Sequence, residues 1–393
     1  MKIVGIVAEY NPFHTGHAYH IGATRRSIGE DTGILCVMSG NWVQRGETAL
    51  TDKWTRAALA LSGGADLVAE LPTPWAISSA EGFARGAVWL LDAAGADYLS
   101  FGSETGELSA LLRAGECLES NEYRLYLREG LDGGLSFAAA RQRAVSLCAG
   151  EVSDCLTGPN NNLGVEYLRA TAALQSKMQP ITVSRQGTGH DDETPRDGYC
   201  SASALRDFLL SGQYAAAAPY LPSGGTDRLR AAGFYTLKHC ELGVLSKLRT
   251  MSPDQFEMLP DCGAELAARL SRAARDAVSL EEVYELAKTR RYAHARIRRL
   301  VLWAFLGLTA ADRPDHPPYL RILGMNERGR ALLRQLDARC RIPVLVKPAH
   351  VNRMGEEARR LFATESRCTD LYSLCGEKIM PGGREYTQNP VVV

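Results

Sequence analysis

Hydrophobic positions in the first two hundred residues form short apolar runs that alternate with segments of helical spacing. Each run is bounded by Gly, Pro or Asp, which is typical of strands, whereas apolar residues three and four apart favour helices. This alternation predicts a parallel sheet with right-handed crossovers and helices on both faces. The predicted strands span 2–9, 33–39, 66–71, 97–101 and 180–185, and the predicted helices span 16–28, 53–62, 78–94, 107–118 and 160–175.

The pattern changes further along the chain. Residues 119–150 are helical and rich in polar side chains, which favours an insertion that covers the site. A clear helix is predicted over 201–211, after which Leu, Ala and Arg at helical spacing mostly replace strand signals, apart from one strand at 342–346. We therefore expect an α/β domain with a Rossmann-like, doubly wound parallel sheet over 1–225, and a mainly helical domain over 226–393.

Charge is distributed unevenly, although the formal net charge is +0. Residues 1–227 carry 17 Lys and Arg against 26 Asp and Glu, a balance of −9, while residues 228–393 carry 28 against 19, a balance of +9. A basic half is typical of a part that faces nucleic acid. Two domains with differently solvated surfaces would give the same asymmetry, so charge alone leaves both interpretations open.

Cysteine use and hydropathy bear on the compartment. The ten cysteines form no C-x-x-C pair, and scattered cysteines without a secretory signal favour reduced, mostly buried thiols. A zinc site from Cys368, Cys375 and a histidine is a less favoured alternative. No apolar run approaches the roughly 20 residues that span a bilayer. We expect a cytoplasmic protein without membrane contact, and no protein partner is predicted.

The first chemical motif follows the first predicted strand and reads Tyr10-Asn11-Pro12-Phe13-His14-Thr15-Gly16-His17. Pro12 cannot join a strand ladder and Gly16 permits close backbone approach, so the motif predicts a strand-to-helix turn. The start of the helix offers free N–H groups and the positive end of its dipole to a phosphate. His14 and His17 can donate to the same phosphate and stabilise charge as it is attacked. The alternative is a turn whose histidines only cap the helix.

A second motif begins the helix predicted over 201–211. Ser201 is a suitable N-cap, and Ser203 with the amides of the first turn could bind the β- and γ-phosphates of a nucleotide. Arg206 lies near that end and could neutralise the departing pyrophosphate. Alone, the pattern Ser-x-Ser-x-x-Arg is most often a capped helix. In combination with the histidine motif, it favours a triphosphate site.

Together the two motifs resemble those of the HxGH nucleotidylyltransferase superfamily, and further blocks resemble the bacterial tRNA(Met) cytidine acetate ligase family over nearly the whole chain. The resemblance implies adenylation of acetate with ATP, then acetyl transfer to N4 of the wobble cytidine of elongator tRNA(Met). Because acetate is already an anion at neutral pH, its attack on the α-phosphate needs no general base. The matching blocks lie at 39–47, 52–54, 66–72, 101–104, 158–167, 292–299 and 319–324.

The resemblance also implies a set of site residues. The residues expected to be catalytic are His14, His17, Ser203 and Arg206. The residues expected to surround ATP are Val7, Ala8, Glu9, Tyr10, Asn11, Pro12, Phe13, His14, Thr15, Gly16, His17, His20, Gly102, Asn160, Asn161, Arg185, Gln186 and Ser201. Without the resemblance, Asn160 and Asn161 would equally suit a turn and a helix cap.

Magnesium is expected with ATP, but no magnesium ligand is assigned. Several carboxylates near the site could pair with the ion or with a lysine. For each of them, a local hydrogen bond at the end of a strand is the favoured interpretation. These carboxylates are Glu9, Asp52, Glu70 and Glu104.

The basic half contains a cluster of Lys, Arg and His within 288–299, with Tyr292 among them. Such a cluster can neutralise phosphates, and a tyrosine can stack on a base or ribose. The alternative is a solvated helix face with internal ion pairs. The residues expected to contact RNA are Arg290, Arg291, Arg296, Arg298 and Arg299, and a weaker basic patch lies over 328–341.

Two other functions remain open. A nucleotidylyltransferase that joins AMP to a small metabolite would share both phosphate motifs, but it would leave the basic half without a role. A non-catalytic RNA-binding protein with a vestigial pocket would explain the basic half. However, the histidines, serines and arginine of the two motifs are all present, which argues against a decayed site.

Overall fold

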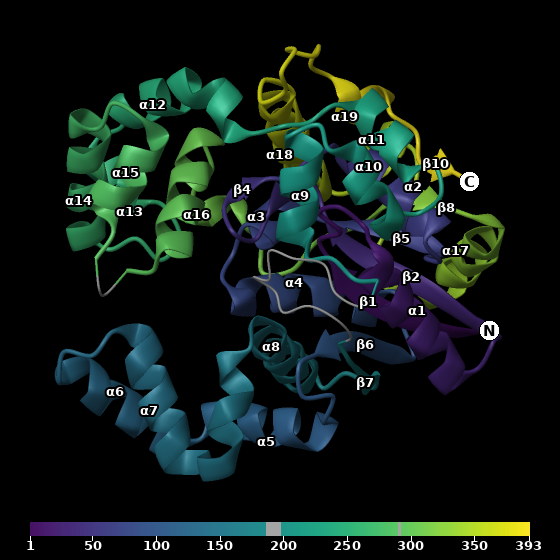
Figure 1. The fold of residues 1–393 in the computed structure, drawn as a ribbon, viewed down its shortest axis with the longest axis horizontal. Coiled ribbons are helices and arrows are strands. Elements are labelled where there is room, and N and C mark those ends of the chain that lie inside the picture. The colour runs from purple at the N-terminus through teal and green to yellow at the C-terminus, as the bar shows by residue number, and fades with distance from the viewer. Residues whose placement is uncertain (186–197, 290–291) are drawn as a thin grey trace.

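The computed structural model describes residues 1–185, 198–289 and 292–393, and Figure 1 shows how the elements are arranged. An eight-stranded sheet forms the centre of the molecule. Its strands are β1 (Lys2–Ala8), β2 (Thr32–Ser39), β5 (Leu67–Leu71), β6 (Tyr98–Ser103), β7 (Gln179–Ser184), β8 (Leu320–Met325), β9 (Val344–Leu345) and β10 (Val391–Val392). Their order is β10-β8-β5-β2-β1-β6-β7, with β9 paired to β8.

The five strands predicted in the first two hundred residues form the parallel centre of this sheet. β1 pairs in parallel with both β2 and β6, β2 pairs with β5, and β6 pairs with β7. The chain therefore builds outward from β1 to β5 on one side and then crosses to β6 and β7 on the other. This reversal makes the carboxyl ends of β1 and β6 a topological switch point, where doubly wound sheets bind their ligands.

Helices cover both faces of the sheet, and alternate residues of β1 are buried under each layer. Val4 and Ile6 belong to the core on one face, whereas Ile3 belongs to the core on the other. The first face carries α1 (Thr15–Ile28), α2 (Lys53–Ser62), α9 (Ala202–Leu210), α10 (Tyr214–Ala217) and α11 (Gly225–Ala232). The second face carries α3 (Thr73–Ala76), α4 (Ala80–Ala93), α5 (Leu108–Glu119), α8 (Pro159–Ala173), α17 (Glu327–Arg339) and α18 (Glu356–Ser373). The predicted α/β, Rossmann-like fold is confirmed.

Two helical groups extend from this body (Figure 1). The helices α6 (Asn121–Asp132) and α7 (Phe137–Ala149) pack on each other as a hairpin that continues from α5. The second group, called here the helical cluster, has its own core, which includes Leu245, Leu266 and Trp303. It consists of α12 (Glu241–Arg249), α13 (Pro253–Glu257), α14 (Ala264–Asp276), α15 (Leu280–Ala287) and α16 (His294–Phe305). In the part of the chain that the structure describes, no helix is long and apolar enough to cross a membrane.

The C-terminal tail contacts both the helical cluster, through Cys368 and Tyr372 of α18, and the sheet. β8 pairs antiparallel with β5, and β9 and β10 pair with β8, so the tail completes the sheet of the N-terminal half. The remaining helix, α19 (Arg384–Thr387), precedes β10. Residues 226–393 therefore divide between a helical part and an extension of the sheet, and β9 lies within the strand predicted at 342–346. The sheet is predominantly parallel rather than wholly parallel.

A buried ionic network joins this tail to the N-terminal half. Lys53, which is fully buried, places its Nζ 2.7 Å from Glu70 and 2.7 Å from Glu385. Arg321 on β8 lies 3.4 Å from the other oxygen of Glu385. Charges removed from water require partners of opposite sign, which is why these groups occur together. Glu70 is thus the partner of a lysine, one of the alternatives that its sequence position left open.

Candidate active site

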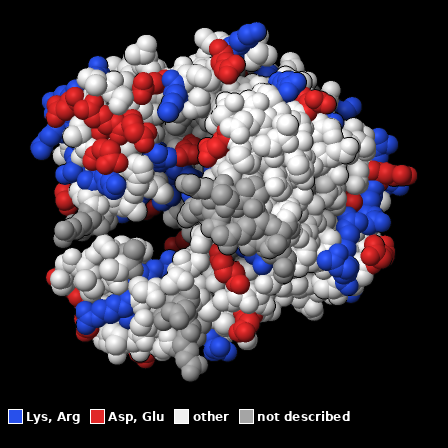
Figure 2. Space-filling view, viewed as in Figure 1, with Lys and Arg blue, Asp and Glu red and all other residues white. Residues whose placement is uncertain are grey.

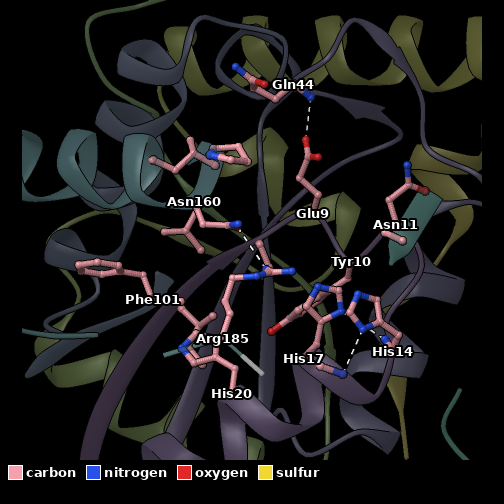
Figure 3. Close-up of a pocket in the computed structure, with 18 of the residues that line it drawn as sticks. Glu9, Tyr10, Asn11, His14, His17, His20, Gln44, Phe101, Asn160 and Arg185 are labelled. Atoms are coloured by element: carbon pink, nitrogen blue, oxygen red, sulfur yellow. Dashed lines mark hydrogen bonds between the residues drawn. The ribbon is translucent and has the colours of Figure 1, made fainter. Parts of the chain in front are cut away.

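A cavity of about 440 Å³ opens at the switch point of the sheet. Its walls come from the carboxyl ends of β1, β6 and β7 and from the starts of α1, α8 and α9. Further parts of the wall come from α4, through Ala80 and Phe83, and from a short hairpin of β3 (Trp42–Val43) and β4 (Glu47–Thr48), through residues 43–45 and 47. Figure 3 shows the side chains that point into this space.

His14 and His17 form the turn that leads from β1 into α1. His14 is the N-cap of the helix, and its Nδ1 accepts a hydrogen bond of 3.1 Å from the backbone N–H of Gly16. The Nδ1 of His17 accepts a hydrogen bond of 3.2 Å from the backbone N–H of His14. Because both Nδ1 atoms act as acceptors, each neutral ring carries its proton on Nε2. The histidines therefore cap the helix with one nitrogen and keep the other as a donor.

Burial keeps these imidazoles neutral. Burial first, and the positive charge of Arg185 next, lower the pKa of His14 from 6.5 to about 3. The pKa of His17 is also well below 6.5, because of burial first and then because of His14, Arg185 and His20. Burial and Arg185 bring the pKa of His20 to about 4. At neutral pH the turn thus presents uncharged N–H donors.

Two arginines supply fixed positive charge to the cavity. Arg185 follows β7, and its Nη1 donates to Oδ1 of Asn160 over 3.2 Å. Arg206 on α9 donates from Nη1 to the carbonyl oxygen of Asn11 (3.1 Å) and from Nη2 to Oγ of Ser203 (3.0 Å). Burial lowers the pKa of both guanidinium groups, yet arginine remains protonated in proteins. Two cations beside neutral donors suit a polyanionic ligand.

The start of α8 is held by Glu104 rather than by a ligand. The carboxylate of Glu104 accepts hydrogen bonds from the backbone N–H groups of Asn160 (3.0 Å) and Asn161 (2.7 Å). The Oδ1 of Asn161 accepts in return from the backbone N–H of Glu104 over 2.9 Å. Asn161 is buried by these contacts, whereas Asn160 lines the cavity. The favoured local interpretation of Glu104, a hydrogen bond at a strand end, agrees with this geometry.

The structure brings most of the predicted site residues together. Those that line the cavity are Val7, Ala8, Glu9, Tyr10, Asn11, His14, Gly16, His17, His20, Gly102, Asn160, Arg185, Ser201 and Arg206. Those that do not line it are Pro12, Phe13, Thr15, Asn161 and Ser203. Gln186 lies outside the described residues.

Each residue that lies off the cavity wall has another contact. Phe13 is fully buried, and a Cβ at Gly63 would lie only 2.0 Å from its ring. The hydroxyl of Thr15 donates to the carbonyl oxygen of Gly198 over 3.2 Å. Ser203 accepts from Arg206 and so orients the guanidinium group that does line the cavity. ATP contact by these residues stays a prediction.

The hairpin wall was given no site role by the sequence. Gln44, Arg45 and Glu47 line the cavity, and the backbone N–H of Gln44 donates to Oε1 of Glu9 over 2.7 Å. Strands of two residues are too short for a periodic pattern. The only signal in the sequence was the family block at 39–47. Other cavity residues without a predicted role include Tyr19, Phe83, Phe101, Leu163, Tyr167 and Tyr199.

The predicted RNA-contacting arginines of α16 have partners within the protein. Arg298 forms ion pairs with Glu47 of the hairpin and with Glu281, and Arg299 donates to the carbonyl oxygen of Gln44 over 3.4 Å. Arg296 donates to the carbonyl oxygen of Asp261. Two of these arginines therefore fasten α16 to the wall of the cavity. The other two predicted RNA contacts, Arg290 and Arg291, lie outside the described residues.

The surface beside these residues is hollowed. Figure 2 shows a cleft between the helical cluster and the lobe formed by α5, α6 and α7, with both Lys and Arg and Asp and Glu side chains on the two lobes. No residue of α6 or α7 lines the cavity. The segment expected to cover the site thus borders this outer cleft instead.

Comparison with known proteins gives the same fold and one family. A family model described as HIGH Nucleotidyl Transferase matches residues 1–385. A tRNA(Met) cytidine acetate ligase from Acetivibrio thermocellus is 35% identical, with 100% of both chains covered. An enzyme of the same name from Syntrophotalea carbinolica is 38% identical over 93% of this chain and 89% of its own length.

Two solved structures of Thermotoga maritima TmcAL extend this comparison. The apo form superposes with a TM-score of 0.93 at 30% identity over 100% of each chain. The form bound with alpha-thio ATP superposes with a TM-score of 0.91, also at 30% identity over 100% of each chain. Full-length similarity in sequence and structure shows that this chain belongs to the tRNA(Met) cytidine acetate ligase family, within the HIGH nucleotidyl transferases.

Proposed function

We propose that this protein adenylates acetate with ATP and transfers the acetyl group to N4 of the wobble cytidine of elongator tRNA(Met). The observation that carries the proposal is the pair of neutral imidazoles, His14 and His17, which line a cavity at the switch point of the sheet and use only Nδ1 to cap the helix. The relatives named tRNA(Met) cytidine acetate ligase support the substrates, and the neighbour bound with alpha-thio ATP supports the nucleotide.

The cavity suits attack on the α-phosphate. Donors fixed beside a phosphate stabilise the charge that develops there without reorganisation during the reaction. Neutral imidazoles supply hydrogen bonds, while Arg185 and Arg206 offset the charge of the triphosphate and of the acetate. Since acetate is already ionised, the residues need to align it and exclude water rather than remove a proton.

Magnesium remains a prediction. Among the described residues, no group of three His, Cys, Asp or Glu side chains could hold a metal ion. Mg²⁺ usually binds nucleotides through phosphates, water and one or two carboxylates, so the expected ion would arrive with the nucleotide and neutralise part of its charge.

The helical cluster and the outer cleft are the proposed contact surface for tRNA. Both lobes of the cleft carry Lys and Arg side chains among Asp and Glu (Figure 2), and contacts from such cations to phosphates position a nucleic acid. We retain the predicted division into a catalytic part over 1–225 and an RNA-facing part over 226–393. Within the latter, the helical cluster is the favoured contact, because the tail is committed to the sheet. A cytoplasmic location would follow from the tRNA substrate.

The test is an assay with two channels. The protein is incubated with ATP, acetate or other small acids, and bulk tRNA, and both pyrophosphate release and the mass of tRNA nucleosides are followed. Acetate-dependent pyrophosphate release together with acetylated cytidine is the expected result. AMP joined to another metabolite would instead favour the small-molecule nucleotidylyltransferase. Inactivity in both channels, with tRNA still bound, would favour the non-catalytic RNA-binding protein.

A further inference from the structure

Acetyl transfer to an amine releases a proton, and the cavity contains one carboxylate placed to receive it. We infer that the carboxylate of Glu9 accepts the proton that N4 of the cytidine loses during acetyl transfer. This inference rests on the proposed function, and it assigns Glu9 a role in the second half of the reaction rather than the first.

The balance of the transfer step defines what is needed. The N4 lone pair attacks the carbonyl carbon of the acetyl-adenylate, so an N–C bond forms and the bond from that carbon to the phosphate oxygen breaks. The bond pair leaves with AMP, whose phosphate is a stable anion and needs no proton. The nitrogen, which carried two hydrogens, keeps one in the amide. One proton is therefore released, and a group within reach must accept it.

The imidazoles of the cavity cannot be this acceptor. His14 and His17 already accept backbone N–H groups at Nδ1, so their remaining nitrogens carry protons. The Nε2 of His20 lies 2.9 Å from Oγ of Ser100, and burial has already lowered the pKa of this ring to about 4. Burial raises the pKa of the phenols of Tyr10 and Tyr167, which therefore stay protonated.

Two carboxylates remain among the described residues of the cavity wall, Glu9 and Glu47. Glu47 is ion-paired with Arg298 of α16, so its negative charge is already used to fasten the hairpin. Glu9 forms no ion pair among the described residues, and its Oε1 accepts a hydrogen bond from the backbone N–H of Gln44. An ion-paired carboxylate is a weaker base than one that forms no ion pair.

The surroundings of Glu9 raise its basicity. Burial raises the pKa of this carboxyl above 4.5, and this effect outweighs the hydrogen bond from Gln44. The charged groups that face it are Arg56 on α2, Arg206 on α9 and Arg45 on the hairpin, and all three lower its pKa. Tyr167 on α8 faces it as a neutral phenol. A carboxyl with a raised pKa can hold a proton during the step and release it to water afterwards.

The position of Glu9 matches the side from which RNA is proposed to approach. Its side chain points toward Gln44 and away from the imidazoles of His14 and His17 (Figure 3). The hairpin that carries Gln44 is in turn fastened to α16 through Arg298 and Arg299. The phosphates of the nucleotide would lie beside the imidazoles, and N4 of the cytidine would enter past the hairpin. The two reactants would therefore meet near Glu9.

The experiment uses Glu9→Gln, which keeps a hydrogen-bond acceptor for Gln44 but is not a base. Transfer is measured in single turnover from chemically prepared acetyl-adenylate to tRNA(Met), and adenylation is measured separately by acetate-dependent ATP–pyrophosphate exchange. We expect transfer to fall by roughly 100-fold or more, as for loss of a general base. We expect the loss in exchange to be smaller than the loss in transfer by at least a factor of about ten.

The pH profile gives a second readout. In the unaltered protein the transfer rate should rise with pH through the raised pKa of Glu9 and then level off, whereas in Glu9→Gln it should keep rising as hydroxide replaces the carboxylate. Glu9→Asp should recover at least about tenfold of the transfer rate, since a carboxylate is restored. Glu47→Gln is the matched control, because it changes the ion-paired carboxylate of the same wall and should retain the plateau.

The outcomes separate this inference from the proposed function. If the unaltered protein shows neither exchange nor acetylation, the proposed function fails. If it shows both, but Glu9→Gln transfers at the original rate or loses both half-reactions equally, the role of Glu9 fails while the function stands. If Glu9→Gln does not fold, the pH profile of the transfer rate is compared between the unaltered protein and Glu9→Asp. Identical profiles in these two proteins would overturn the role of Glu9.

Discussion

The ring centroids of His14 and His17 lie 3.8 Å apart, and the backbone N–H of His14 donates to Nδ1 of His17. This contact, with the matching one from Gly16 to His14, fixes the tautomer of both rings. Capping the helix and serving a phosphate had been alternative interpretations of this motif. They use different nitrogens, so one does not exclude the other.

The first prediction concerns His17. In His17→Ala the Nε2 donor is lost, so acetate-dependent ATP–pyrophosphate exchange should fall by about 10²–10³-fold, as for removal of one oxyanion donor. Binding of tRNA should persist, because this residue lies in the cavity rather than on the outer cleft. The control is His316→Ala, which removes a ring stacked on Trp89 and should leave exchange unchanged. Loss of tRNA binding with normal exchange would contradict the assignment.

The second prediction concerns stability and pH. Because the pKa of His20 falls from 6.5 in the unfolded chain to about 4 in the folded protein, the unfolded chain binds more protons between these values. This histidine therefore makes stability decrease as pH falls below 6.5, by about 1.4 kcal/mol per pH unit. His20→Gln should remove that part of the slope in denaturant unfolding at several pH values.

The comparison in this experiment must be between slopes. Glu365 acts in the opposite direction, because its pKa is raised to about 8 by burial first and by Glu70 next, so its contribution is lost as pH rises from 4.5 to 8. Substituting the exposed His350 by Gln provides the control for loss of a histidine outside the cavity. An unchanged slope in His20→Gln would be inconsistent with a neutral, buried imidazole.

The third prediction concerns the contact of the hairpin with α16. Gly46 has a φ of +80°, and a Cβ there would lie 2.5 Å from the backbone nitrogen of Arg299. Gly46→Ala should therefore separate the hairpin from α16. It should lower the free energy of unfolding by at least about 2 kcal/mol more than the backbone strain of a positive φ alone. Gly134→Ala is the control for strain, because φ there is +83° and nothing lies within 4 Å. Equal loss of stability in both variants would show that the contact does not matter.

The fourth prediction concerns Arg296, which does not contact the hairpin in the described structure and donates to the carbonyl oxygen of Asp261. If it also neutralises a phosphate, Arg296→Ala should weaken tRNA binding and reduce the salt slope of the affinity by about 1. Arg298→Ala should instead impair adenylation too, because it releases Glu47 of the cavity wall. Filter binding at several salt concentrations distinguishes these results, and an unaltered slope in Arg296→Ala would argue against RNA contact.

Much of the fold was predictable because each central strand leaves a local pattern in the sequence. β1 and β2 are short apolar runs, and the helices between strands show clear amphipathic spacing, so pattern alone located them. β8 was missed for a physical reason. Arg321, the second residue of this strand, looks exposed in a hydropathy pattern, yet it is buried against Glu385, which lies more than sixty residues away. Pairing across such a distance leaves no periodic trace.

The candidate site was predictable where one motif supplies several contacts. The turn from Val7 to His17 places both histidines, Gly16 and Glu9 on the cavity because one strand end and one helix start carry them all. Predictions for individual residues were less secure. Phe13 and Asn161 lie within the right segments, but their side chains are used for packing and for the start of α8. Which way a side chain points within a turn depends on tertiary contacts.

The most direct measurement is a crystal structure of this protein with a non-hydrolysable ATP analogue whose α,β-bridging oxygen is replaced by methylene. We expect the nucleotide in the cavity at the end of β1, with Nε2 of both His14 and His17 within about 3.2 Å of α-phosphate oxygens, a normal hydrogen-bond distance. A nucleotide bound elsewhere, or in this cavity with both Nε2 atoms turned away from its phosphates, would contradict this expectation.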